Sequence, residues 1–102
     1  MKCLTLYLHK QSTEDVLDCL RESPLVTGFT LTHGEGHSLD SNTDWSQAAI
    51  DRVVGFVPRV RVEVILEDDQ VEEVLAALKA SLSSTQSHAV WSVVSLDGFG
   101  RL

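Results

Sequence analysis

Cysteine, proline, methionine and tyrosine are all scarce in this chain of 102 residues, which has two cysteines, two prolines, one methionine and one tyrosine. Two cysteines, Cys3 and Cys19, are too few for a disulfide framework, so we expect a cytoplasmic protein with two reduced thiols. No apolar run approaches the roughly 18 residues of a membrane span, which argues against direct membrane insertion. The first residues are interrupted too early by polar side chains to form a signal peptide.

Basic residues are also few, since 8 lysines and arginines stand against 15 aspartates and glutamates, for a net charge of -7. A surface this acidic repels phosphate backbones, which argues against nucleic acid as a partner. The 43% hydrophobic and 23% charged residues argue against a disordered chain. The length suits one domain with its own core, and we expect a single domain over residues 1–102.

We expect strands over 2–9, 25–33, 56–66 and 89–96. Apolar and polar residues alternate in 2–9 and 56–66, while 89–96 is apolar on both faces. In 56–66, the valines point one way, while Arg59, Arg61 and Glu63 point the other. Residues 34–54 contain glycines and clusters of Ser, Asn, Asp and Thr with little apolar periodicity. A loop of that length inside a compact domain is typical of a functional segment. Within it, 44–54 has the spacing of a short helix.

Two segments have helical spacing and plausible beginnings. Ser12 with Asp15, and Asp69 with Glu72, resemble capping boxes, and Ser23-Pro24 ends the first helix. The resulting order βαββαβ is a split βαβ pattern, an α+β sandwich with two helices on one face of a four-stranded antiparallel sheet. We expect Tyr7, Trp91 and Val93 on the open face, where identical subunits would cover them.

Several segments resemble the PII signalling proteins. The resemblance is carried by Met1-Lys2, Asp15-Val16, Gly28-Phe29-Thr30-Leu31 and the strand that contains Pro58-Arg59-Val60-Arg61-Val62-Glu63. It implies a ferredoxin-like subunit, a homotrimer whose sheets face the central axis, and a long loop over 34–54. It also implies a regulatory protein without enzymatic activity, which senses a small ligand and acts through that loop on a protein partner such as a transporter.

The resemblance further implies a set of ligand-binding residues, which are Gly28, Phe29, Thr30, Arg59, Glu63 and Arg101. PII proteins hold nucleotide phosphates with a glycine- and lysine-rich loop before the last strand. Here residues 83–88 contain neither glycine nor lysine. Because phosphate binding needs close backbone approach and positive charge, we expect weak ATP binding, with a preference for fewer phosphates. Arg59, Arg61 and Glu63 alternatively form an ion-pair network between subunits.

His33-Gly34 and Trp91 are similar to residues of small PII-like proteins often encoded beside heavy-metal efflux pumps, which implies an efflux pump as partner. His33, Glu35 and His37 share one side if their segment is extended, and two imidazoles with a carboxylate suit a divalent transition metal. Asp40, Asp44 or a neighbouring subunit would complete such a site. The alternative function is therefore a metal-binding or divalent-cation-tolerance module, and the alternative for these three residues is an ordinary polar strand end.

No arrangement of residues typical of an enzyme is present. The sequence has no G-x-S-x-G, no Walker lysine loop and no H-E-x-x-H, and nothing pairs its four histidines with a particular serine or cysteine. The ligand is an adenine nucleotide, as the resemblance implies, or a divalent transition metal, as the histidine segment suggests. Without a catalytic arrangement, we expect either to be sensed and not transformed.

Overall fold

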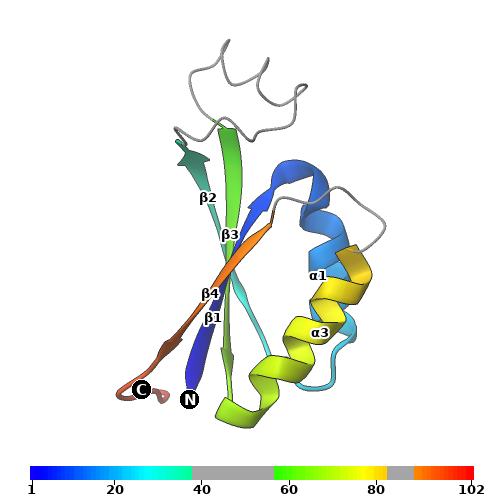
Figure 1. Cartoon of the computed structure of the whole chain (residues 1–102). Coiled ribbons are helices and arrows are strands. Elements are labelled where there is room, and N and C mark those ends of the chain that lie inside the picture. The colour runs from blue at the N-terminus through cyan, green and yellow to red at the C-terminus, as the bar shows by residue number, and fades with distance from the viewer. Residues whose placement is uncertain (38–56, 83–88) are drawn as a thin grey trace.

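The computed structural model describes residues 1–37, 57–82 and 89–102, and the expected helix over 44–54 and the polar stretch 83–88 lie outside them. The described elements are β1 (Lys2–His9), η1 (Lys10–Ser12), α1 (Thr13–Glu22), β2 (Thr30–Gly36), β3 (Val57–Leu66), η2 (Asp68–Gln70), α3 (Val71–Leu82) and β4 (Val90–Ser95). The strands form one sheet in the order β2-β3-β1-β4, and every neighbouring pair is antiparallel (Figure 1). This is the ferredoxin-like α+β sandwich that the sequence predicted.

Helices α1 and α3 lie together against one face of the sheet, so the described elements leave its other face open (Figure 1). The core lies between the two layers because apolar residues alternate along the strands and recur at helical spacing in the helices. Its most deeply buried side chains are Leu4, Leu8, Val16, Leu20, Val62, Val64 and Leu66. In β3, Val60, Val62 and Val64 lie in this core, as the alternation predicted.

Strand β2 differs from the prediction at both of its ends. It pairs with β3 from Thr30 opposite Glu63 to Gly36 opposite Val57, so it begins and ends later than the predicted 25–33. Leu25, Val26 and Phe29 pack against the core from outside the strand ladder, which explains their apolar character. The glycines Gly34 and Gly36 led to the prediction of a loop. A glycine, however, has a backbone N–H and a C=O that can both form the hydrogen bonds of a strand ladder. The long connection therefore starts after Gly36 and not at Gly34.

Trp91 and Val93 lie on the helix side of the sheet, so their predicted place on the open face was wrong. Trp91 is opposite Leu6 and Val93 is opposite Leu4, and directly opposed residues share one face of a sheet. Lys79 of α3 places its Nζ 5.8 Å from the centre of the Trp91 ring. Because β4 is apolar on both sides, its pattern could not show which side faces the helices.

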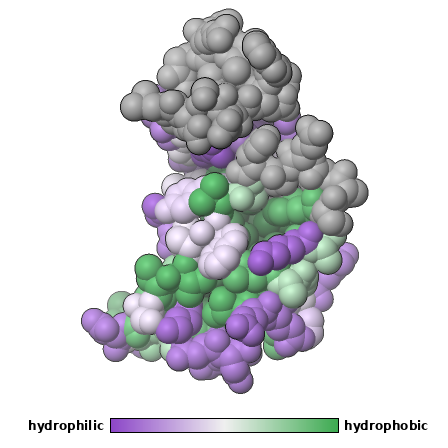
Figure 2. All heavy atoms as spheres, viewed as in Figure 1, coloured by the Kyte–Doolittle hydropathy of each residue, from purple (hydrophilic) through white to green (hydrophobic). Residues whose placement is uncertain are grey.

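The open face instead receives Val90 and Val94 from β4, which are 56% and 55% exposed. Figure 2 shows apolar atoms gathered across the middle of the molecule, over the part of the surface where β4 and α3 lie. The apolar residues that β4 contributes to the open face are therefore Val90 and Val94, in place of the predicted Trp91 and Val93.

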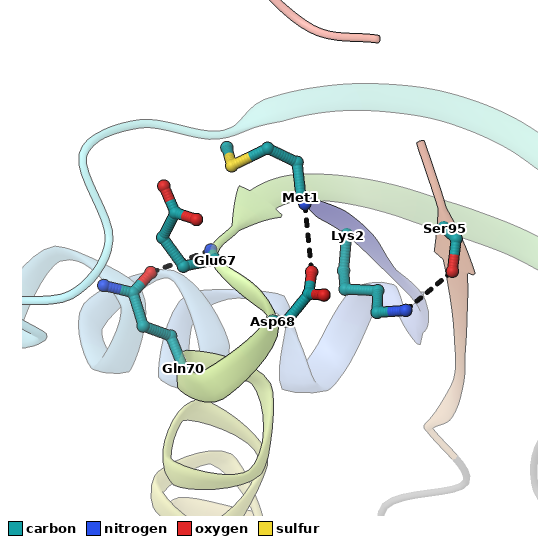
Figure 3. A network of polar contacts seen from close by, with 6 residues as sticks. All are labelled: Met1, Lys2, Glu67, Asp68, Gln70 and Ser95. Carbon is teal, nitrogen blue, oxygen red and sulfur yellow. Dashed lines mark hydrogen bonds and ion pairs between the residues drawn. The ribbon is translucent and has the colours of Figure 1, made fainter. Parts of the chain in front are cut away.

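Both helix beginnings differ in detail from the predicted capping boxes. Ser12 does precede α1, but its hydroxyl donates to the carbonyl oxygen of His9 at 3.2 Å and no side chain caps the helix. The second helical segment begins with η2, where Glu67 and Gln70 form the box in place of Asp69 and Glu72. Its Glu67 backbone N–H donates to Gln70 Oε1 at 2.9 Å (Figure 3). The end of α1 at Ser23 is as predicted.

The amino end of the chain is held by three polar contacts, two of which are drawn in Figure 3. The amino group of Met1 lies 2.9 Å from Asp68 Oδ1, and Lys2 Nζ donates to Ser95 Oγ at 2.6 Å. The backbone N–H of Leu96 donates to the Met1 carbonyl oxygen at 3.1 Å. The hydrogen bond and the positive charge of the amino group lower the pKa of Asp68 below its ordinary value. These contacts join the start of β1 to η2 and to the end of β4.

Candidate functional site

The open face of the sheet carries its side chains in rows that cross the strands. From the Gly36 end of β2 onward, the register gives four rows: Gly34, Arg59 and His9; Thr32, Arg61, Tyr7 and Val90; Thr30, Glu63, Thr5 and Ser92; and Ile65, Cys3 and Val94. The first two rows carry the cationic side chains and the last row is apolar. The open face therefore changes from cationic at one end to apolar at the other.

A hollow of about 400 Å³ lies at the cationic end of this face. It is lined by residues of β1, β2 and β3, namely Tyr7, Thr32, His33, Gly34, Glu35, Gly36, Arg59 and Arg61. Two guanidinium groups, a phenol and a threonine hydroxyl give this hollow donors for an anion.

The two arginines of the hollow differ in their partners. Arg61 forms an ion pair with Glu63, with its NH2 nitrogen 2.6 Å from Glu63 Oε1. Within residues 1–37, 57–82 and 89–102, no hydrogen bond or ion pair reaches the guanidinium of Arg59, which is half-buried. Arg61 is thus paired within its own subunit, which does not test the predicted network between subunits. Among the described residues, Arg59 is the arginine of the hollow that has no polar partner.

The backbone of β2 carries no side chain where Arg59 crosses it. A methyl group built on Gly36 would lie 2.5 Å from Arg59 Cγ and 2.6 Å from Arg59 Nε. The same construction on Gly34 meets nothing within 4 Å. The side chain of Arg59 therefore lies flat against the bare backbone at Gly36. The sequence contained one sign of this arrangement, the glycines at the alternate positions 34 and 36. They were interpreted as part of the predicted loop instead.

The residues predicted to bind a nucleotide are divided among three places. Thr30 is opposite Glu63, and Gly28 and Phe29 directly precede this pair. Arg59 is four residues along β3 from Glu63, about 13 Å at the rise of a strand. Arg101 follows β4, the edge of the sheet opposite to β2, and is exposed. One subunit thus brings Thr30 and Glu63 together but keeps Arg59 and Arg101 apart from them.

The residues predicted to bind a metal lie at and just beyond the end of β2. His37 Nε2 is 3.2 Å from Glu35 Oε1, and both side chains are exposed. His33 lies on the same side of β2 as Glu35. Across the part of the chain that the structure describes, no group of three His, Cys, Asp or Glu side chains is arranged to hold a metal ion. Asp40 and Asp44 lie outside the described residues.

Comparison with protein families gives a match over the whole chain. The family described as "Protein of unknown function (DUF3240)" matches residues 1–102. The chain belongs to this family. A solved structure of a DUF3240 family protein from Shewanella baltica OS155 superposes on it with a TM-score of 0.76, at 19% identity, over 99% of this chain and 94% of that one. That likeness supports the ferredoxin-like fold.

Curated relatives add the PII connection. The nitrogen regulatory protein P-II of Mesorhizobium japonicum is 29% identical over 79 residues, which are 78% of this chain and 70% of that protein. The nitrogen regulatory protein GlnK of Escherichia coli K12 is 29% identical over 75 residues, 74% of this chain and 66% of that protein. This DUF3240 chain is therefore a divergent PII-like protein, as its sequence indicated, and its named relatives are regulatory proteins.

Two further features of the DUF3240 chain bear on its partners. Among the helices in the described ranges, none is long and apolar enough to cross a membrane. A second hollow, of about 560 Å³, lies between α1 and α3 and is lined by Asp15, Asp18, Glu22 and Glu73 among others. Its carboxylates repel anions, so the hollow beside Arg59 is the better candidate for an anionic ligand.

Proposed function

We propose that this chain is a non-enzymatic regulatory protein of the PII type, which binds a small anion in the hollow on the open face and acts on a protein partner such as a transporter. The observation that carries the proposal is that Arg59, a half-buried residue, has a guanidinium without a described polar partner, beside a second arginine and two hydroxyl groups. An unpaired cation in a hollow binds an anion more strongly than an exposed one, because less water competes for it.

The ligand class that we propose is an adenine nucleotide with few phosphates. Only one arginine of the hollow lacks an ion pair among the described residues, and residues 83–88 contain no glycine or lysine that could hold further phosphates. Each charge-assisted bond contributes about 1.5–3 kcal/mol, so losing two lowers the affinity by roughly two orders of magnitude or more. We therefore expect ATP to bind no more tightly than in the high micromolar range.

We further propose a homotrimer, in which a neighbouring copy supplies Arg101 to the pair of Thr30 and Glu63. Strands β2 and β4 are the two edges of the sheet and run in opposite directions. A rotation about an axis along the strands would place β4 of one copy antiparallel to β2 of the next, with its C-terminal tail towards the start of β2. The apolar row of the open face would then be covered by the other copies.

The test is calorimetric titration of the protein with ATP, ADP, AMP and inorganic phosphate. We expect at least one of them to bind and Arg59→Ala to weaken it by roughly 10- to 100-fold, since one charge-assisted contact is lost. Arg21→Ala, which removes the same charge from α1, is the matched control and should leave the affinity unchanged. Equal effects of the two substitutions, or no binding of any anion at millimolar concentration, would contradict the proposal.

A metal-binding module is the second candidate, favoured by the 3.2 Å contact between Glu35 and His37. We expect zinc or copper, if bound here, to raise the melting temperature, because a ligand specific for the folded state stabilises it. The His33→Ala/His37→Ala double variant should then lose the shift, whereas His88→Ala should keep it. An unchanged shift of the melting temperature in the double variant would show that the metal binds outside this segment.

A further inference from the structure

We infer that Gly36 is a positioning residue for Arg59: its missing side chain allows Arg59 to lie across β2 and holds the guanidinium at the anion hollow. The inference rests on the proposed function, because the hollow is the proposed ligand site. It adds Gly36 to the residues that binding requires, although Gly36 has no side chain with which to contact a ligand.

The first support is the close approach of the two residues. A methyl group on Gly36 would lie 2.5 Å from Cγ, 2.6 Å from Nε and 3.1 Å from Cδ of Arg59. These atoms belong to the middle of the side chain, so a small rotation at its tip cannot relieve the clash. Any side chain at position 36 must therefore move the stem of Arg59 and with it the guanidinium.

The second support is that nothing in the backbone demands glycine at this position. Gly36 lies in β2, opposite Val57, and its φ is outside the left-handed region that disfavours other residues. Alanine can adopt this extended conformation, so its effect would come from the contact with Arg59 and not from strain in the strand.

The third support is that no competing polar contact from the described part of the chain holds Arg59. Its ladder partners on the open face are His9 and Gly34, and among the described residues no carboxylate or carbonyl oxygen binds its guanidinium. Arg61, by contrast, is held in place by Glu63. With no ion pair to orient it, the direction of Arg59 depends on the surface it packs against, which is the bare backbone of β2.

The test compares Gly36→Ala with Gly98→Ala, a control at which an added methyl group meets nothing within 4 Å. Titrated with ADP and with inorganic phosphate, Gly36→Ala should bind roughly tenfold more weakly than the wild type, the loss typical of a displaced charged partner. Gly98→Ala should bind as the wild type does. Equal affinity in Gly36→Ala and the wild type would overturn the inference.

A double-mutant cycle distinguishes positioning from direct blocking of the hollow. If Gly36 acts through Arg59, the glycine substitution should add less than about twofold in an Arg59→Ala background, because the residue it displaces is already gone. A full tenfold loss in that background would show that the methyl group obstructs the ligand itself, and would overturn the positioning role.

A measurement without any ligand separates this inference from the proposed function. Phenylglyoxal modifies arginine side chains, and mass spectrometry resolves the modification of Arg59 from that of Arg61. Arg59 should react several-fold faster in Gly36→Ala than in the wild type, while Arg61 should react equally in both. If Arg59 reacts at different rates in Gly36→Ala and the wild type but no anion binds, the proposed function is refuted and the placement of Arg59 stands. If Arg59 reacts at the same rate in both proteins, the inference is refuted whichever ligand binds.

Discussion

At the scale of single residues, two arginines on one strand differ in their polar contacts because their neighbours differ. Arg61 has Glu63 two residues along the same face and pairs with it at 2.6 Å. Arg59 has Gly34 and Gly36 beside it on β2, which supply a surface but no charge. From the sequence, anion binding and ion pairing between subunits were equal alternatives for Arg59, Arg61 and Glu63. The sequence could not distinguish the two arginines, because their contacts depend on which residues of β2 lie opposite them.

The first prediction at this scale concerns pH and Asp68. The amino group of Met1 lowers the pKa of this carboxyl from its ordinary value of 3.8. A depressed pKa in the folded state adds stability above the unfolded pKa, and that stability is lost as the pH falls through the folded value. We expect Asp68→Asn to melt at a slightly lower temperature than the wild type at pH 7, with the difference vanishing at low pH.

NMR titration of the Asp68 side chain checks the same prediction directly. Its carboxyl should titrate below the ordinary value of 3.8. A midpoint for Asp68 at or above that value would show that the amino group is not paired with it in solution.

At the scale of elements, the strands and helices with a clear apolar periodicity were predicted more accurately than those without one. Strand β3 has charged residues on one side and mostly valines on the other, and its predicted bounds of 56–66 are within one residue of the observed ones. The start predicted for the second helix, at Asp69, is within two residues of the start of α3. Strand β4 is apolar on both sides, and the glycines of β2 are uninformative about pairing. In those two strands the register is decided by the neighbouring strand, which the local sequence does not contain.

The prediction at the element scale concerns the core between β1 and the helices. Leu4 has no exposed surface, and Leu4→Ala should lower the free energy of unfolding by about 2–5 kcal/mol through lost burial and the cavity left behind. Leu102→Ala is the matched control, since that side chain is fully exposed, and should change it by less than about 0.5 kcal/mol. Urea unfolding followed by circular dichroism measures both, and similar values would contradict the described core.

At the scale of the whole molecule, the two faces of the sheet differ in what covers them. The helices cover one face, while Val90 and Val94 remain more than half exposed on the other, in line with Tyr7 and Cys3. Open apolar rows of this kind mark surfaces that bind other chains. The sequence placed Tyr7 on this face correctly but also assigned Trp91 and Val93 to it, because a one-residue change of parity exchanges the faces.

The prediction at this scale concerns assembly. Sedimentation equilibrium of the wild type should give a mass near three times 11.2 kDa. Val94→Asp should reduce it to that of one chain, because assembly would bury an unpaired charge. Ala76→Asp, on the exposed side of α3, should leave the mass unchanged. A wild-type monomer at micromolar concentration, or an intact trimer of Val94→Asp, would contradict the proposed arrangement.

The contact between Lys79 and Trp91 also makes the indole an optical reporter of one particular event. Its ring lies on the helix side of the sheet with the ammonium group 5.8 Å away, so its emission responds to the separation of α3 from β4. A Trp45→Phe variant would leave Trp91 as the single tryptophan. Its signal should then follow the loss of packing between α3 and β4 during unfolding, so that fluorescence reports the separation of these two elements directly.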